Sequence, residues 1–149
     1  MNARQNGVAM VEFALTLPLL LLLTMITTEF GRAIYQYNTI VKSVRSAARY
    51  LSIQTPNSAL IADPAAIAAA TNLVVYGTPS GTGTPLVPGL TVSNVPTPTW
   101  QTTGSMPLIN TVTIKVSGYT FKPLVTGVFG TVFGNITFHD ISATMRCPS

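Results

Sequence analysis

An apolar run from Gly7 to Ile26, which carries one carboxylate, constrains this chain more than any other feature. A hydrocarbon core of about 30 Å needs roughly 20 apolar residues in a helix, so the stretch from Val8 to about Thr28 is long enough to cross a bilayer. A secretory signal has a shorter apolar region, about 7–15 residues, followed by a small-residue cleavage site. Here the run leads into Thr-Thr-Glu-Phe-Gly-Arg without such a site. We therefore expect the run to be retained as a membrane span.

Glu12 is the unusual residue of this run. An acidic side chain at mid-bilayer costs about 2.5–3.5 kcal/mol, so such residues usually have a partner or a function. The simplest interpretation is that Glu12 lies near one end of the span and reaches head-group water. However, Gly7, Glu12 and Phe13 reproduce the Gly-x-x-x-x-Glu-aromatic pattern of prepilin processing sites, after a short basic stretch at residues 1–7. The pattern favours a role for this carboxylate.

The first third of the chain resembles the TadE-like proteins, the minor pseudopilins of tight-adherence (Flp) type IV pilus systems. The resemblance combines the Gly7-to-Glu12 spacing with Leu-Pro-Leu, Glu-Phe-Gly-Arg and Ala-Ala-Arg-Tyr in that order. It implies that residues 1–7 are a prepilin leader and that a prepilin peptidase cuts after Gly7. The cut would leave a free amine on Val8. An ion pair between this amine and Glu12 of a neighbouring subunit would then set the register of assembly, because each charge offsets the burial cost of the other.

The helix is expected to continue beyond the membrane. With no Gly or Pro between Ala33 and Thr55, we predict one helix over residues 8–53, bent near Pro18 and membrane-spanning to about residue 28. Its second half is amphipathic, with apolar residues that alternate in steps of four and three. These residues form the predicted helix packing seam: Phe30, Ile34, Tyr37, Val41, Val44, Ala48 and Leu51. The seam is expected to cover the chain's own sheet, or to pack against helices of other subunits.

Residues 54–149 are predicted to form one extracytoplasmic α+β domain. Thr55-Pro56-Asn57 ends the long helix, and Asp63-Pro64 has the residues of an N-cap and first helical position. A short helix is expected over 64–76, although residues 73–76 fit a strand equally well. A loop rich in Gly and Pro follows at 77–89.

The sheet is expected over residues 90–147. We predict a short strand at Leu90–Val95, then a second loop from Pro96 to Pro107 in which Trp100 folds over the core. Alternating apolar residues predict two longer strands that pair antiparallel. In each strand the alternation of apolar residues is interrupted once, at Gly118 and at Asp140, and we call these interruptions phase shifts. The fold class is thus α+β and pilin-like, with a long N-terminal helix packed on a small antiparallel sheet of three or four strands.

The remaining sequence gives little support for catalysis, metal binding or nucleic-acid binding. Charged residues make up 8% of the chain against about 25% in ordinary soluble domains. No basic patch with interleaved aromatics predicts nucleic-acid binding, and no residue cluster has metal-ligand spacing. Only His139 with Asp140 could begin a catalytic triad, and no nucleophile accompanies them. The single cysteine, Cys147, excludes an internal disulfide, and an isolated or buried thiol is favoured over pairing between chains. We expect neither enzyme activity nor a cofactor.

The sequence therefore predicts a minor pilin or pseudopilin that takes part in assembly of a tight-adherence pilus. Its expected partners are the prepilin peptidase, other pilus subunits, the inner-membrane assembly platform and the lipid bilayer. The resemblance places the N-terminus in the cytoplasm and the domain in the periplasm, whereas the excess of Arg32, Lys42 and Arg45 after the span would favour the reverse orientation. The alternative is an unprocessed, membrane-anchored adhesin or scaffold of a secretion or surface complex.

Overall fold

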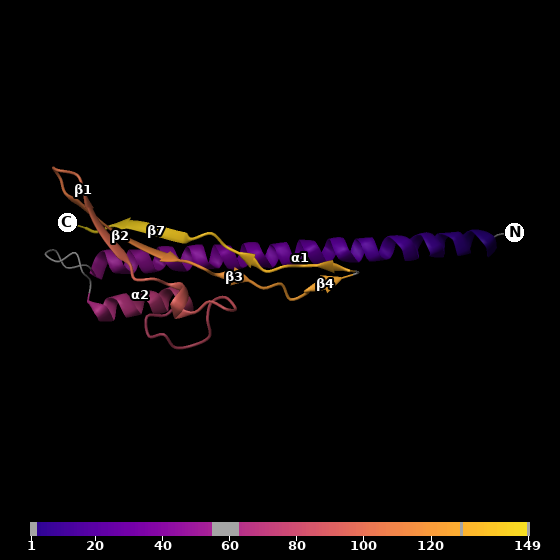
Figure 1. The fold of residues 1–149 in the computed structure, drawn as a ribbon, viewed down its shortest axis with the longest axis horizontal. Helices are drawn as coiled ribbons and strands as arrows, with labels where there is room; N and C mark the ends of the chain where they lie inside the picture. Colours follow the sequence, from indigo (N-terminus) through magenta and orange to yellow (C-terminus); the bar gives the residue numbers. More distant parts are fainter. Residues whose placement is uncertain (1–2, 55–62, 129, 149) are drawn as a thin grey trace. The chain divides into compact units, whose positions relative to one another are not determined.

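The computed structural model describes residues 3–54, 63–128 and 130–148. Its first element is the single helix α1 (Ala3–Gln54), which continues through Pro18 and begins before the expected start at Val8 (Figure 1). One continuous helix across the apolar run and the amphipathic half is thus confirmed. The expected break at Thr55-Pro56-Asn57 lies outside the described residues.

The second helix, α2 (Pro64–Tyr76), has the bounds that the sequence predicts. The Asp63 carboxylate accepts a hydrogen bond from the Ala65 amide at 3.0 Å, and Pro64 occupies the first turn, where its missing donor costs nothing. Gly77 ends the helix in the left-handed conformation (φ 75°), and its amide donates to the Leu73 carbonyl. Residues 73–76 are therefore helical, which resolves the open choice between helix and strand.

Within the described residues, the strands form one three-stranded sheet and two short two-stranded ribbons, all antiparallel. The main sheet has the order β1-β2-β7, from β1 (Thr99–Thr103), β2 (Ile109–Val116) and β7 (Ile141–Arg146). The two ribbons are β3 (Thr120–Phe121) with β6 (Ile136–Thr137), and β4 (Gly127–Val128) with β5 (Thr131–Val132).

The two predicted phase shifts lie opposite each other. Val116 pairs with Ile141 on one side of the interruption, and Thr120 pairs with Thr137 on the other. Gly118 supplies a positive φ of 66°, and the Phe138 amide donates to the Tyr119 carbonyl at 2.9 Å within the gap. Because both strands leave and rejoin the regular ladder at the same level, antiparallel pairing survives the shift. The predicted pairing of these two segments is confirmed.

Two sequence predictions between residues 90 and 107 are wrong. Leu90–Val95 is not a strand, because Val92–Asn94 forms a 3₁₀ turn, η1. The Asn94 side chain accepts from the Thr91 amide and hydroxyl, at 3.0 and 2.8 Å, and these local bonds replace strand pairing. The predicted loop at 96–107 instead contains β1, whose mostly exposed, Thr-rich residues show no apolar alternation. Trp100 is half-buried against the core from within this strand.

The chain divides into two compact units, and α1 contributes to both. The larger unit contains Tyr35–Phe121 and Ile136–Ser149, and it holds the hydrophobic core. In this core the C-terminal half of α1 (Ile40, Val44, Ala47, Ala48, Leu51) packs with α2 and with the inward face of β2 (Val112, Ile114, Val116). Burial of these side chains is the main stabilising contribution. The smaller unit contains Met1–Ile34 and Lys122–Asn135.

The structure is therefore α+β, with a long N-terminal helix on a small antiparallel sheet, as the sequence predicts.

Candidate anchoring and assembly helix

The N-terminal half of α1 presents apolar side chains outward. Within the described residues, α1 is the one helix long and apolar enough to cross a membrane, and none of its most apolar window is buried in the structure. Leu15 and Leu19, for example, are 75% and 63% exposed. Exposed leucines along several turns are unfavourable in water but match the solvent inside a bilayer. This half of α1 is compatible with a single-pass membrane anchor.

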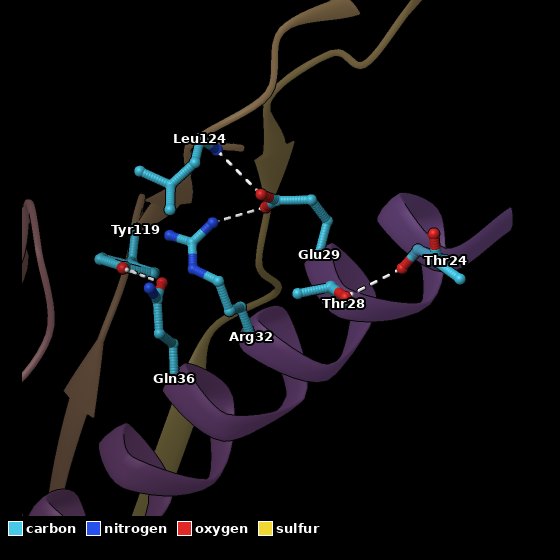
Figure 2. Close-up of polar contacts among 7 residues, drawn as sticks. All are labelled: Thr24, Thr28, Glu29, Arg32, Gln36, Tyr119 and Leu124. Carbon is cyan, nitrogen blue, oxygen red and sulfur yellow. Dashed lines mark hydrogen bonds and ion pairs between the residues drawn. The ribbon is translucent and has the colours of Figure 1, made fainter. Parts of the chain in front are cut away.

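The hydroxyl groups of this half are satisfied by the helix itself. Thr24 donates to the Leu21 carbonyl at 2.9 Å, and Thr27 donates to the Leu23 carbonyl at 2.8 Å. Thr28 donates to the Thr24 carbonyl at 2.9 Å (Figure 2). Thr16 likewise donates to carbonyls one turn earlier. Unsatisfied polar groups cost several kcal/mol in lipid. These internal bonds let the threonines enter a bilayer without other partners.

The predicted processing residues lie on the exposed surface of the first turns. Gly7 and Val8 are helical in the structure, so the peptide bond expected to be cut is not extended. Val8 and Glu12 share one face of α1 with Val11 and Leu15, as a spacing of four dictates. Phe13 is 61% exposed. Among the described residues no side chain pairs with the Glu12 carboxylate, so any ionic partner must come from outside that part of the chain.

Glu29 is a buried carboxylate that links two segments of the chain, and the sequence analysis did not single it out. Its side chain is buried, and the two carboxylate oxygens accept from different groups (Figure 2). Oε2 pairs with the Arg32 guanidinium one turn later, and Oε1 accepts from the Leu124 amide at 3.2 Å. Charge-assisted bonds of this kind are among the stronger ones in proteins. Glu29 thus fastens the segment 122–135 to α1 within the smaller unit.

Gln36 plays a comparable part within the larger unit. The Tyr119 hydroxyl lies 2.8 Å from the Gln36 amide oxygen (Figure 2). It also lies 2.9 Å from the Pro88 carbonyl oxygen, so its single proton is shared between these two acceptors. Tyr37 and Tyr119 both contact the ring of Phe138. Glu29, Gln36 and Ser43 are all buried at seven-residue intervals, a polar stripe on one helix face. This spacing is the sequence signal that would have identified them.

The predicted packing seam agrees with the observed buried face only in its C-terminal part. Val44, Ala48 and Leu51 are fully buried, and Val41 packs against the core. Phe30, Ile34 and Tyr37 are instead 64%, 46% and 44% exposed, whereas Ala33, Gln36 and Ile40 are buried. The prediction followed large apolar residues and excluded polar ones. Gln36 and Ser43 are tolerated inside because their polar atoms are hydrogen-bonded, Ser43 to the Ile40 carbonyl.

The residues considered for chemistry lie elsewhere in the larger unit. His139 is exposed, and Asp140 forms an ion pair with Lys115 across the strands, at 3.1 Å. Cys147 is buried, and its amide donates to the Asn110 carbonyl. In residues 3–54, 63–128 and 130–148, no group of three or more His, Cys, Asp or Glu residues has the arrangement of a metal site.

Fold and helix together define a class of protein, an α+β domain carried on one long helix whose N-terminal half suits a bilayer. Comparison with known families is more specific. Residues 7–49 match the family model described as TadE-like protein, which confirms the resemblance found in the sequence. The matched stretch covers the apolar half of α1 and most of its amphipathic half. No curated protein and no solved structure matches the chain. The family match suggests involvement in the tight-adherence pilus system.

Proposed function

We propose that this protein is a minor pilin or pseudopilin of a tight-adherence type IV pilus. The observation that carries the proposal is the TadE-like match over residues 7–49, a range that includes Gly7, Glu12 and Phe13. Support also comes from the single helix α1, which contains this whole range. The N-terminal half of α1 anchors the protein in the bacterial inner membrane, with the N-terminus in the cytoplasm. The α+β domain then lies in the periplasm, from which the subunit can enter a pilus.

Glu12 has the properties that a register-setting group needs. It is exposed on α1 within the membrane segment, and no described side chain pairs with it. Cleavage after Gly7 creates an amine on Val8, one helical turn away on the same face. In a subunit array, the Val8 amine of one chain and Glu12 of another neutralise each other only when the helices are aligned. Partners in this step are other pilus subunits and the assembly platform.

A second function is favoured by the conformation of the cut site. Gly7 and Val8 lie within α1, whereas proteases bind the scissile backbone in an extended form. Cleavage therefore requires the first turns of α1 to unwind, and a chain whose helix stays intact would remain full-length. Such a chain would serve as a membrane-anchored adhesin or scaffold.

Mass spectrometry of the N-terminus separates the two functions. In cells that contain the prepilin peptidase, we expect the mature chain to begin at Val8, and cells without the peptidase should retain Met1. The variant Gly7→Val should block cleavage, because its side chain occupies space beside the cut bond that glycine leaves open for a close approach of the peptidase. Gly31→Val is the matched control, since a Cβ at either glycine meets nothing within 4 Å. An intact Met1 in peptidase-containing membranes would contradict processing and support the scaffold function.

A further inference from the structure

The segment 122–135 is held beside the N-terminal part of α1 in the smaller unit. Glu29 accepts the Leu124 amide at 3.2 Å, directly after the expected end of the membrane span at Thr28. From Leu124 the chain runs to β4 in the direction of the N-terminal end of α1 (Figure 1). Strands β4 and β5 then form a two-stranded ribbon, extended by a bond from the Phe133 amide to the Thr126 carbonyl at 3.0 Å. The segment thus lies beside α1, starting at Glu29, where the expected membrane span ends.

The composition of this segment is unusual for a water-exposed hairpin. Residues 123–138 contain no Asp, Glu, Lys, Arg or His, and Lys122 and His139 flank them. Leu124 and Val132 are 77% and 80% exposed. An uncharged hairpin with outward apolar side chains is unfavourable in water, and a charged residue at its base is typical of elements that meet a membrane surface.

The depth of such a contact is limited by the backbone. A two-stranded ribbon has two open edges whose N–H and C=O groups need hydrogen bonds. Lipid-exposed sheet edges do not occur in the hydrocarbon core because no water is present there. The head-group layer supplies water and polar lipid groups, while apolar side chains can reach about 5–10 Å into the acyl boundary.

From these observations we propose that the hairpin formed by residues 122–128 and 130–135 is a second membrane-contacting element, which lies in the head-group layer of the leaflet around the C-terminal end of the span. The inference rests on α1 spanning the membrane, as in the proposed function. Leu124 and Val132 enter the acyl boundary, and the exposed Lys122 stays at the phosphate level. The hairpin then fixes the depth and rotation of α1, because Glu29 and Leu124 connect the two elements.

Fluorescence quenching by brominated lipids tests this placement. The full-length protein, with Trp100→Phe as background, is placed at one chain per phosphatidylcholine–phosphatidylglycerol nanodisc. Single tryptophans are introduced by Val132→Trp and Leu124→Trp in the hairpin, by Leu19→Trp in the span, and by Met106→Trp as a matched exposed control, 94% exposed between β1 and β2. We expect lipids brominated near the head-group end of the acyl chain to quench the two hairpin variants. Met106→Trp should lose fluorescence only to aqueous iodide.

The outcomes distinguish this inference from the anchor on which it rests. In one outcome, brominated lipid quenches Leu19→Trp, while both hairpin tryptophans respond to iodide like the Met106 control. The hairpin then lies in water and the inference fails, but the membrane anchor is supported. If the hairpin tryptophans are shielded from both quenchers, protein covers them and the inference also fails. If Leu19→Trp itself is not quenched, α1 does not span the membrane, and both proposals fail.

Discussion

Both halves of α1 carry many apolar residues, but these side chains lie in different surroundings in the two halves. In the N-terminal half, leucines face outward on all sides and the threonines bond to their own helix. In the C-terminal half, one face of the helix is almost completely buried. This face includes the polar residues Gln36 and Ser43. The first half matches lipid as a solvent, and the second half forms part of a protein core.

This difference shows that helix continuity is no guide to the environment of a helix. Each half carries a carboxylate or amide that the surroundings must satisfy. Glu29 and Gln36 find their partners within their own units, at Leu124 and Arg32 and at Tyr119. Glu12 finds none among the described residues. Glu29 and Gln36 thus contribute to the folding of their own units, whereas Glu12 makes no such contribution among the described residues.

The largest expected contrast comes from one truncation in each half. Ile40 is fully buried, so Ile40→Ala should lower the free energy of unfolding by about 2–5 kcal/mol through lost burial and a cavity. Leu20→Ala removes a side chain that is 56% exposed, so it should change the free energy of unfolding by about 0.5 kcal/mol or less. Denaturant unfolding of both full-length variants in detergent micelles measures the difference. Equal losses would mean that the two halves are not distinct.

Glu29 is expected to give an intermediate effect. Glu29→Ala leaves the Leu124 amide without its acceptor, at a cost of about 1–3 kcal/mol. Amide hydrogen exchange should therefore speed up at Leu124 by roughly tenfold, because about 1.4 kcal/mol corresponds to that factor. Glu29→Gln keeps an acceptor oxygen and should retain most of the protection. Unchanged exchange at Leu124 in the alanine variant would contradict the tether between α1 and the 122–135 segment.

The smallest effect on stability is expected at Glu12. Because no described side chain pairs with this carboxylate, Glu12→Ala should change the free energy of unfolding of the domain by about 0.5 kcal/mol or less. The same variant should nevertheless be lost from pilus complexes, as measured by co-purification with other subunits. Glu12→Asp, which retains the charge, is the matched control. Normal incorporation of Glu12→Ala would refute the register role, whereas a large loss of stability would place Glu12 among the folding contacts.

The elements that the sequence predicted correctly are those specified by local chemistry. The long helix, the caps of α2 at Asp63 and Gly77, and the paired strands with their phase shifts follow from periodicity and turn residues. The Gly7–Glu12–Phe13 pattern also depends only on spacing along the chain, and its role in processing stays a prediction. Each of these signals lies within a few residues, so no knowledge of the fold is needed to read it.

Tertiary structure decided the features that depend on partners far along the chain. β1 forms because it pairs with β2, although its own residues show no alternation, and Asn94 bonds to the Ser117 carbonyl at the end of β2. The buried face of α1 is set by Tyr119 and by the core, which accept Gln36 and Ser43 inside and leave Phe30 exposed. The sequence by itself determined one helix with an apolar half and an amphipathic half. Only long-range hydrogen bonds and packing determined which face of its second half is buried, because the cost of burying a polar group depends on whether a partner is present.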